Sequence, residues 1–255
     1  MTRPPSDSHY SYTIYADPET AKEFDESRFG GPIGHLVATA QERVLADFAG
    51  DLQGVSVLDV GTGTGRAALA LAKRGARVVG VDSSQEMLRV ARVNAELAAL
   101  EVEFIPGDAN ALQFPDASFD LVVSLRVLMH TPNWRRCLGE MCRVSGDRLI
   151  FDYPPLVSGP ALQVVVRRLV QLTGRQTETY YVISTPAARA VLTNRGFKIS
   201  QLHRQYVLPI ALHKLIGSRR FTERSERVLA SLGLLRLLGS PVTILAERCG
   251  DVGGR

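Results

Sequence analysis

Cysteine is scarce in this chain, with three residues in 255: Cys137, Cys142 and Cys249. Their number and spacing exclude a disulfide framework, and Cys137 with Cys142 lacks the second pair of ligands that a structural zinc site requires. The chain also lacks any uninterrupted apolar run of about 18 residues, the length of a membrane-spanning helix, and its polar, proline-containing start is unlike a secretory signal. We therefore expect a cytoplasmic protein without a bound metal.

Acidic residues are scarce in the second half of the chain. Residues 1–150 contain 15 Lys and Arg against 20 Asp and Glu, whereas residues 151–255 contain 15 against 6. An excess of positive charge can bind nucleic acid, an anionic membrane surface or an acidic substrate, but more often the charged residues only form a solvent-exposed surface. Almost all of this charge is arginine, so charge alone does not separate these functions.

Short β-branched runs alternate with stretches of helical period through the middle of the chain. This spacing predicts right-handed βαβ units and a mostly parallel sheet that is covered by helices on both faces. Two later runs complete a seven-stranded α/β sheet. A helix over 33–49 should precede the first strand, and a helix over 186–195 should end at Gly196. The expected strands are 55–60, 77–82, 102–105, 119–124, 148–151, 197–202 and 241–247, with helices over 64–74, 84–99 and 133–144.

A glycine-rich loop, Gly61-Thr62-Gly63-Thr64-Gly65, follows the first expected strand and opens a helix. Glycines let a ligand lie against the backbone, and a helix N-terminus presents free N–H groups. A dinucleotide fingerprint would place a small residue at position 66, where this chain has Arg66. Asp59 puts a carboxylate beside the place of a pyrophosphate, which disfavours an anion and suits an ammonium group. The loop therefore suits a cofactor with a cationic amino-acid portion.

Polar residues also follow the next three expected strands. Asp82 ends the second strand, where its carboxylate can accept hydrogen bonds from both hydroxyls of a ribose. The alternative is a cap on the following helix, which Ser83 or Ser84 could supply equally well. Asp108 follows the third strand and Ser124 ends the fourth. Because open α/β folds bind ligands at the carboxyl ends of their strands, we expect these residues along one rim.

In its motif order the chain resembles the class I S-adenosylmethionine (SAM)-dependent methyltransferases. Within them it is similar to the methyltransferase type 11 group, which includes the ubiquinone and menaquinone biosynthesis C-methyltransferases. The resemblance runs from about Tyr15 to Tyr153, and its motifs are D-V-G-T-G-T-G, V-D-S-S-Q-E-M-L, G-D-A, F-D-L-V-V-S and R-L-I-F-D after a helix. It implies a Rossmann-like fold, SAM as the cofactor and methyl transfer as the reaction.

The resemblance also implies which residues meet SAM. The glycine-rich loop and Asp59 would contact the methionine part of SAM. Asp82 would bind the ribose, and Asp108 and Ala109 would contact the edge of the adenine. Where relatives have a Tyr-Asp pair in an N-terminal lid, this chain has Phe24-Asp25, so a lid hydroxyl must come from Tyr15 or be absent. The implied cofactor contacts are Asp59, Gly61, Thr62, Gly63, Thr64, Gly65, Asp82, Ser83, Met87, Asp108, Ala109, Ser124 and Leu125.

Methyl transfer from a sulfonium disperses positive charge, so alignment of the reactants and exclusion of water matter most. A phenol or an activated carbon gains from a base, and His130 is the candidate because it follows the fourth strand at the ligand rim. The alternative for His130 is packing at the Thr131-Pro132 turn. Asp152, just past the fifth strand, is a second candidate. We expect His35 at the surface and Trp134 in helix packing.

The stretch of about 210–238, between the last two strands, combines helical character with basic charge. A basic amphipathic helix of this kind fits peripheral contact with a membrane surface or an amphiphilic substrate, and the alternative is a pocket cover that packs on the same molecule. A smaller insertion over 154–181 is expected to line the same pocket. We expect one domain, with lid helices in 1–50, a SAM-binding core in 51–153 and an acceptor-side half in 154–255. The basic residues of the larger stretch are Arg219, Arg220, Arg224, Arg227 and Arg236.

The hypothesis that these features favour is methyl transfer to a small-molecule or lipid-like acceptor, such as a quinone precursor or a phenol. An RNA or protein methyltransferase is the alternative, although N-P-P-Y and Pro-Cys acceptor motifs are missing, so no nucleic-acid partner is expected. A SAM-binding protein without transferase activity would keep the same motifs. Arg66 and Asp59 together disfavour a nicotinamide oxidoreductase. A loop that binds no ligand is also disfavoured, because a tight turn needs fewer glycines than this loop contains. The oligomeric state has no signal in the sequence.

Overall fold

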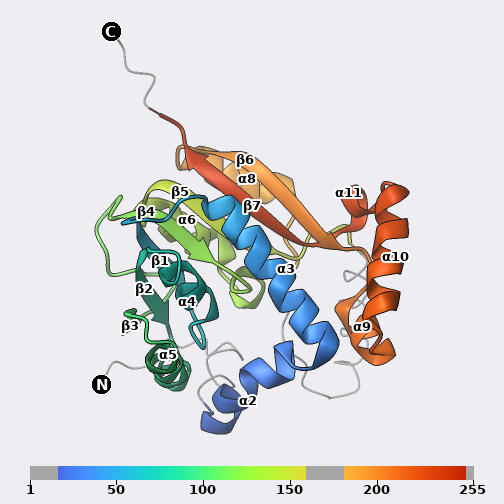
Figure 1. Ribbon diagram of the computed structural model, residues 1–255. Coiled ribbons are helices and arrows are strands. Elements are labelled where there is room, and N and C mark those ends of the chain that lie inside the picture. Colours follow the sequence, from blue (N-terminus) through green and yellow to red (C-terminus); the bar gives the residue numbers. More distant parts are fainter. Residues whose placement is uncertain (1–16, 159–180, 251–255) are drawn as a thin grey trace, which may run out of the picture.

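A computed structural model describes residues 17–158 and 181–250 of the chain. Its centre is a seven-stranded sheet with the strand order β3-β2-β1-β4-β5-β7-β6 (Figure 1). Only β7 runs antiparallel to its neighbours β5 and β6, which confirms the predicted mostly parallel α/β sheet. The strands are β1 (Ser56–Val60), β2 (Arg77–Asp82), β3 (Glu103–Pro106), β4 (Phe119–Ser124), β5 (Ser145–Tyr153), β6 (Phe197–Tyr206) and β7 (Ser240–Arg248).

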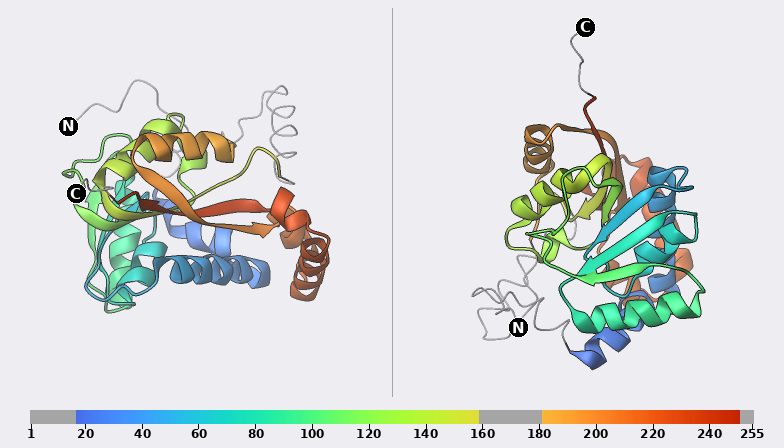
Figure 2. Two further views of the ribbon diagram at one scale, coloured as in Figure 1. Left: turned by 90° about the horizontal axis from the view of Figure 1, so that it is seen from above. Right: turned by 90° about the vertical axis from the view of Figure 1, so that its left-hand side faces the viewer.

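Helices cover both faces of this sheet (Figures 1 and 2). The helices of the described residues are α2 (Pro18–Phe29), α3 (Gly31–Ala49), α4 (Arg66–Ala72), α5 (Gln85–Leu97), α6 (Trp134–Val144), α8 (Thr185–Asn194), α9 (Ile210–Ile216), α10 (Arg219–Ser231) and α11 (Leu234–Leu238), with a 3₁₀ turn η1 (Leu128–His130). Helices α3, α4 and α5 pack on one face of the sheet, and α6 and α8 pack on the other.

The central strands are apolar on both sides because both sides are buried. In β1, Val57 joins the core beneath α3–α5 and Leu58 joins the core beneath α6 and α8. In β4, Leu121 and Val122 divide in the same way, and all four side chains are 0% exposed. Successive side chains of a strand point to opposite faces, so a sheet covered twice needs continuous apolar runs instead of alternation.

The stretch over 210–238 is helical, as the sequence predicts, and it is divided into three helices. Gly217 separates α9 from α10 and Gly233 separates α10 from α11, with φ of 66° and 77°. A residue in this left-handed conformation ends a helix, and glycine adopts it without a Cβ penalty. The three helices gather at one end of the molecule, beyond β6 and β7 (Figure 1).

A buried polar network fastens α9 and α10 to the end of β6. The ring of His213 is 0% exposed, with Nε2 3.0 Å from Glu226 Oε1 and Nδ1 3.1 Å from the Thr222 hydroxyl. The Glu226 carboxylate also accepts hydrogen bonds from the backbone N–H groups of Val207 at 2.7 Å and Leu208 at 2.9 Å. One glutamate therefore closes the junction between the last strand pair and the outer helices.

Two of the expectations concern parts of the chain outside the described residues. They are Tyr15, proposed as a source of a lid hydroxyl, and residues 159–180 of the smaller insertion. Within the described ranges, none of the helices combines the length and apolar character needed to cross a membrane.

Candidate active site

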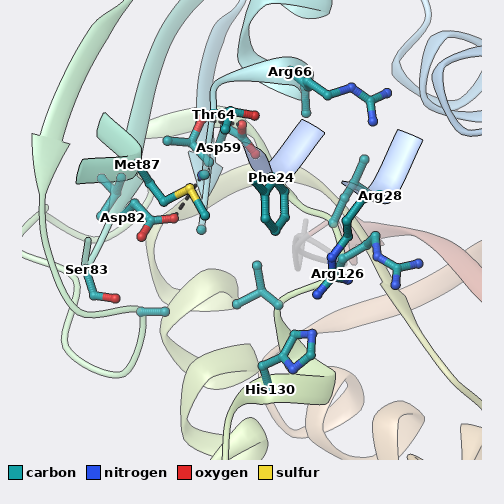
Figure 3. A pocket seen from close by; sticks show the side chains of 18 of the residues that line it. Phe24, Arg28, Asp59, Thr64, Arg66, Asp82, Ser83, Met87, Arg126 and His130 are labelled. Atoms are coloured by element: carbon teal, nitrogen blue, oxygen red, sulfur yellow. Dashed lines mark hydrogen bonds between the residues drawn. The ribbon is translucent and has the colours of Figure 1, made fainter. Parts of the chain in front are cut away.

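A pocket opens at the carboxyl edge of β1, β2 and β4, where the sequence predicts the ligand rim. Figure 3 shows Asp82, Ser83 and Met87 at one end of it, and Arg28, Arg126 and His130 at the other. The lid helices α2 and α3 supply a further side. The residues singled out from the sequence that line this pocket are Asp59, Gly61, Thr62, Gly63, Thr64, Asp82, Ser83, Met87, Ala109, Leu125 and His130.

Two glycines of the loop after β1 are required by close packing. Gly61 has a φ of 71°, and a Cβ there would lie 2.2 Å from Val127 Cγ2, across the pocket floor. Gly65 has a φ of 85° and precedes α4, and its Cβ would lie 3.1 Å from both Ala91 and Phe104. Gly65 therefore lets the loop pack on α5 and β3, and this role differs from the predicted cofactor contact.

Asp59 lies beneath the loop and is 2% exposed. Its Oδ2 accepts hydrogen bonds from the Thr62 hydroxyl at 2.7 Å and from the Ala68 backbone N–H at 3.1 Å. Burial raises the pKa of Asp59 to about 6, and the two hydrogen bonds oppose the rise because they favour the charged form. Because burial removes solvent that would stabilise the charged form of Asp59, a cationic ligand group beside it would favour the ionised carboxylate.

Asp82 ends β2 and bridges two loops. Its Oδ2 accepts a hydrogen bond from Gly63 N–H at 2.8 Å, and its Oδ1 accepts one from Ser84 N–H at 2.9 Å. Burial raises the pKa of this carboxyl, and these backbone donors lower it. The cap of α5 is Ser84, whose hydroxyl accepts the Met87 N–H at 3.1 Å. Asp82 is therefore not needed as the cap, and its carboxylate faces the pocket (Figure 3).

The lid contributes residues that the sequence did not single out as contacts. Phe24, Arg28 and Phe29 of α2 line the pocket. The guanidinium of Arg66 lies 3.7 Å from the centre of the Phe29 ring, and the neighbouring Asp25 accepts a hydrogen bond from the Thr64 hydroxyl at 2.9 Å. The Phe24-Asp25 pair was a signal for this contact, because it marks the lid motif of the family that the chain resembles.

The turn after β4 brings a basic residue over a buried acid. Arg126 has a φ of 64°, and its backbone N–H donates a hydrogen bond to Asp152 Oδ1. Asp152 is 1% exposed, and burial raises its pKa to about 6, against the lowering effect of Arg126. His130, which is 9% exposed, follows in η1 and lines the pocket. Of the two candidate bases, His130 is the one in contact with the pocket, and Asp152 holds the turn beneath it.

Ser124 and Asp108, two further predicted cofactor contacts, are not among the residues that line the pocket. Ser124 is 0% exposed, and its hydroxyl donates to the Val60 carbonyl at 2.9 Å, so it joins β4 to β1. Asp108 Oδ1 accepts hydrogen bonds from the Asn110 backbone N–H at 2.8 Å and from its side-chain amide at 3.0 Å. Both side chains make hydrogen bonds within the protein, and neither lines the pocket.

Other polar and aromatic candidates lie away from the pocket. Trp134 is 7% exposed in the core beneath α6, and His35 lies at the surface, as predicted for both. Cys137 and Cys142 are buried free thiols, and burial raises the pKa of each to about 12. Among the described residues, no group of three or more His, Cys, Asp or Glu is arranged to hold a metal ion.

Comparison with known proteins finds similarity in the part of the chain that contains the glycine loop. Residues 58–148 match a family described as a methyltransferase domain. The chain is 42% identical over 108 residues to a demethylmenaquinone methyltransferase of Thermus thermophilus, covering 40% of this chain and 49% of that protein. It is 31% identical over 156 residues to a ubiquinone biosynthesis O-methyltransferase of Azorhizobium caulinodans, covering 59% and 62%. The chain thus spans about half the length of the first of these relatives.

A similar solved structure is that of magnesium protoporphyrin IX methyltransferase from Synechocystis PCC 6803 with bound S-adenosylhomocysteine (SAH). The TM-score is 0.65 and the identity 22%, over 92% of this chain and 99% of that chain. At this identity the likeness concerns the fold. The matched domain runs from β1 into β5 and contains the glycine loop, Asp59 and Asp82. Residues 58–148 are thus similar to a methyltransferase domain, and the described part of the chain has the fold of a solved methyltransferase.

Proposed function

We propose that the chain binds SAM in this pocket and transfers the methyl group to a small-molecule or lipid-like acceptor, a phenol or a quinone precursor. The observation that carries the proposal is the pair of buried or half-buried carboxylates, Asp59 and Asp82, on either side of a glycine loop. The relatives from T. thermophilus and A. caulinodans are named for quinone methylation, which supports this acceptor class.

The chain would work as one domain with three parts. Residues 1–50 provide the lid, residues 51–153 the cofactor half, and residues 154–255 the acceptor half. The hydrogen bond from Thr64 to Asp25 supports this division, because it joins the lid to the glycine loop at 2.9 Å. Phe24 and Phe29 add apolar surface above the pocket, so a closed lid would exclude water from the reacting groups.

The donors and acceptors of the pocket fit SAM. Asp59 would attract the ammonium group of the methionine part, and Asp82 would accept hydrogen bonds from the ribose hydroxyls. Ser83 and Met87, beyond Asp82, would flank the adenine. When bound, SAM supplies an electrophilic methyl group on a sulfonium. Two carboxylates along one rim would repel a pyrophosphate, which disfavours a dinucleotide.

His130 is the proposed base for an acceptor hydroxyl or carbon acid. It lies at the end of the pocket opposite Asp82, where an acceptor would enter (Figure 3). An imidazole can take up a proton near neutral pH, as such an acceptor requires. Asp152 is nearly inaccessible and bonds the Arg126 backbone, so its part would be to position this turn.

Calorimetric titration tests the function directly. The purified chain is expected to bind SAM with a dissociation constant in the micromolar range and to give no response to NAD or NADH, because the carboxylates favour the cationic cofactor. His130→Ala should keep the SAM affinity of the parent and lose turnover of a phenolic or quinol acceptor.

Three results would contradict this. Tighter binding of NADH than of SAM would favour an oxidoreductase. SAM binding without turnover of any phenol, quinol or lipid acceptor would favour a SAM-binding protein that is not a transferase. Full activity of His130→Ala would return His130 to the packing role at its turn.

We further propose that α9–α11 rest on an anionic membrane surface, where a lipid-like acceptor would be found. Apolar side chains of these helices face solvent: Leu215 is 84% exposed, Leu232 68% and Leu237 65%. This exposure argues against a cover that packs its apolar residues on the same molecule. Residues 210–238 contain six Lys and Arg against two Glu, and such a combination of apolar and basic side chains suits an interface with anionic lipid.

Sedimentation with vesicles tests this contact. The chain should bind vesicles of phosphatidylcholine with phosphatidylglycerol and not vesicles of phosphatidylcholine alone. Replacing Arg220, Arg224 and Arg227 by Gln should weaken binding about 100-fold, since each basic residue near an anionic surface contributes about 1 kcal/mol. Replacing three other exposed arginines, at positions 77, 89 and 135, is the matched control and should have little effect. Equal losses in the two triple variants would mean that net charge alone drives binding.

A further inference from the structure

Positive charge collects at the acceptor end of the pocket. Arg28 and Arg126 both line it there, close together and on the side away from Asp82 (Figure 3). Lys214 lies next to them, because its ammonium group donates hydrogen bonds to the carbonyls of Ser27 at 3.1 Å and Arg28 at 2.8 Å. Burial lowers the pKa of Lys214, and the charges of Arg28 and Arg126 lower it further. Two arginines therefore line this end of the pocket, and a third cation, Lys214, is bonded to the helix end that carries Arg28.

The backbone of Arg126 holds this residue in place. Its φ of 64° is unusual for a bulky residue, and such conformations persist where the surroundings enforce them. The enforcing contact is the hydrogen bond from its N–H to the buried Asp152. The guanidinium Nε is buried and has no hydrogen-bond partner among the described residues. A buried donor of this kind is costly unless a bound group accepts from it.

The lining also includes apolar and aromatic side chains beside the polar Gln41 and Thr131 and beside Glu42, which is paired with Arg66 at 2.9 Å. Phe24 and Phe29 of the lid and Val127 of the turn line the pocket, and Figure 3 shows His130 below Phe24 and Arg126. An arginine presents a planar set of donors that matches the oxygens of a carboxylate or a phosphate. The combination suits a ring that carries an acid group.

We infer that Arg126, with Arg28 beside it, binds an anionic group of the methyl acceptor, a carboxylate or a phosphate, so that aromatic acids are the preferred acceptors. This inference rests on the proposed function, because it assigns the Asp59 and Asp82 end of the pocket to SAM. It makes Arg126 a determinant of acceptor specificity and leaves the methyl group to be aligned by the lid and the loop.

Binding to the SAH-saturated protein tests the inference without turnover. The probes are 4-hydroxybenzoate, 4-hydroxyphenyl phosphate and the neutral 4-hydroxybenzamide, titrated by calorimetry. At least one acid is expected to bind about 10-fold or more tightly than the amide, the effect of one or two charge-assisted hydrogen bonds. Arg126→Gln should remove this preference and leave SAH affinity unchanged, whereas Arg89→Gln, on the exposed side of α5, should keep both. The stronger of the two acids identifies the group.

Each other outcome overturns the inference. The amide binding as well as the acids, acids that fail to bind, or a preference that survives Arg126→Gln would each show that Arg126 does not read an anion. A 10-fold loss of SAH affinity in Arg126→Gln would assign the arginine to the carboxylate of the cofactor. Failure of the parent protein to bind SAH at all would instead overturn the proposed function. Thermal unfolding of each variant confirms that the comparison is between folded proteins.

Discussion

Asp82→Ala is expected to weaken SAM binding by about 100-fold or more, the loss of two hydrogen bonds between a charged carboxylate and ribose hydroxyls at about 1.5–3 kcal/mol each. The variant also removes the acceptor for the Gly63 and Ser84 N–H groups, so the glycine loop would lose a tie to β2. Both effects act in the same direction on affinity. Calorimetric titration with SAM measures their sum.

Two further variants separate these effects. Asp82→Asn keeps one oxygen that can accept from the backbone and loses the charge, so its affinity should fall between those of the parent and Asp82→Ala. Asp47→Ala, at an exposed position of α3, is the control for removal of an acidic residue and should bind as the parent does. An affinity of Asp82→Ala within threefold of the parent, with the fold intact by circular dichroism, would remove Asp82 from the cofactor site.

Glu226→Ala is expected to lower the free energy of unfolding by about 3 kcal/mol. The substitution leaves two backbone N–H groups and a buried histidine without their acceptor, and each unsatisfied buried group costs about 1–3 kcal/mol. The side chain of Glu226 is 13% exposed, so solvent replaces little of what is lost. Chemical denaturation measures the loss, and hydrogen exchange at the Val207 and Leu208 amides reports whether the junction opens locally.

Glu223 offers a matched control on the same helix. It pairs with Arg219 at 2.9 Å, but its side chain is 43% exposed and that of Arg219 66%. Exposed pairs of this type contribute about 0.3–0.5 kcal/mol, so Glu223→Ala should hardly change stability. Similar losses for Glu223→Ala and Glu226→Ala would mean that the charge of α10, and not the buried network, holds the outer helices.

The sheet and its rim could be predicted because their signals are local. Apolar runs such as β1 and β4 are as long as a buried strand, and the glycine loop joins the first strand to its helix within ten residues of sequence. Those segments place Asp59 and Asp82 at the same edge without knowledge of any distant contact. The family resemblance rests on the same segments, which explains why it agrees with the fold.

The lid and several side-chain directions could not be predicted in the same way. Asp25 meets Thr64 across 39 residues of sequence, and apart from the Phe24-Asp25 pair, which marks the lid motif of the resembled family, no local pattern of α2 tells that Arg28 folds over the rim. The strand pattern places Ser124 at the end of β4, but the competition between a ligand and the Val60 carbonyl for its hydroxyl is settled only by packing. The division of 210–238 is different, because Gly217 and Gly233 were visible stop signals.

The bond between Lys214 and the last turn of α2 has a mechanical consequence. The Lys214 ammonium group donates hydrogen bonds to the Ser27 and Arg28 carbonyls, so α9 and the C-terminal end of α2 are joined at one point. The lid cannot swing away from the rim without breaking this tether or pulling α9 along with it. A movement of α9 is therefore expected to move the end of the lid and to change the width of the pocket entrance. A surface that binds the outer helices would then also affect how readily a ligand enters the pocket.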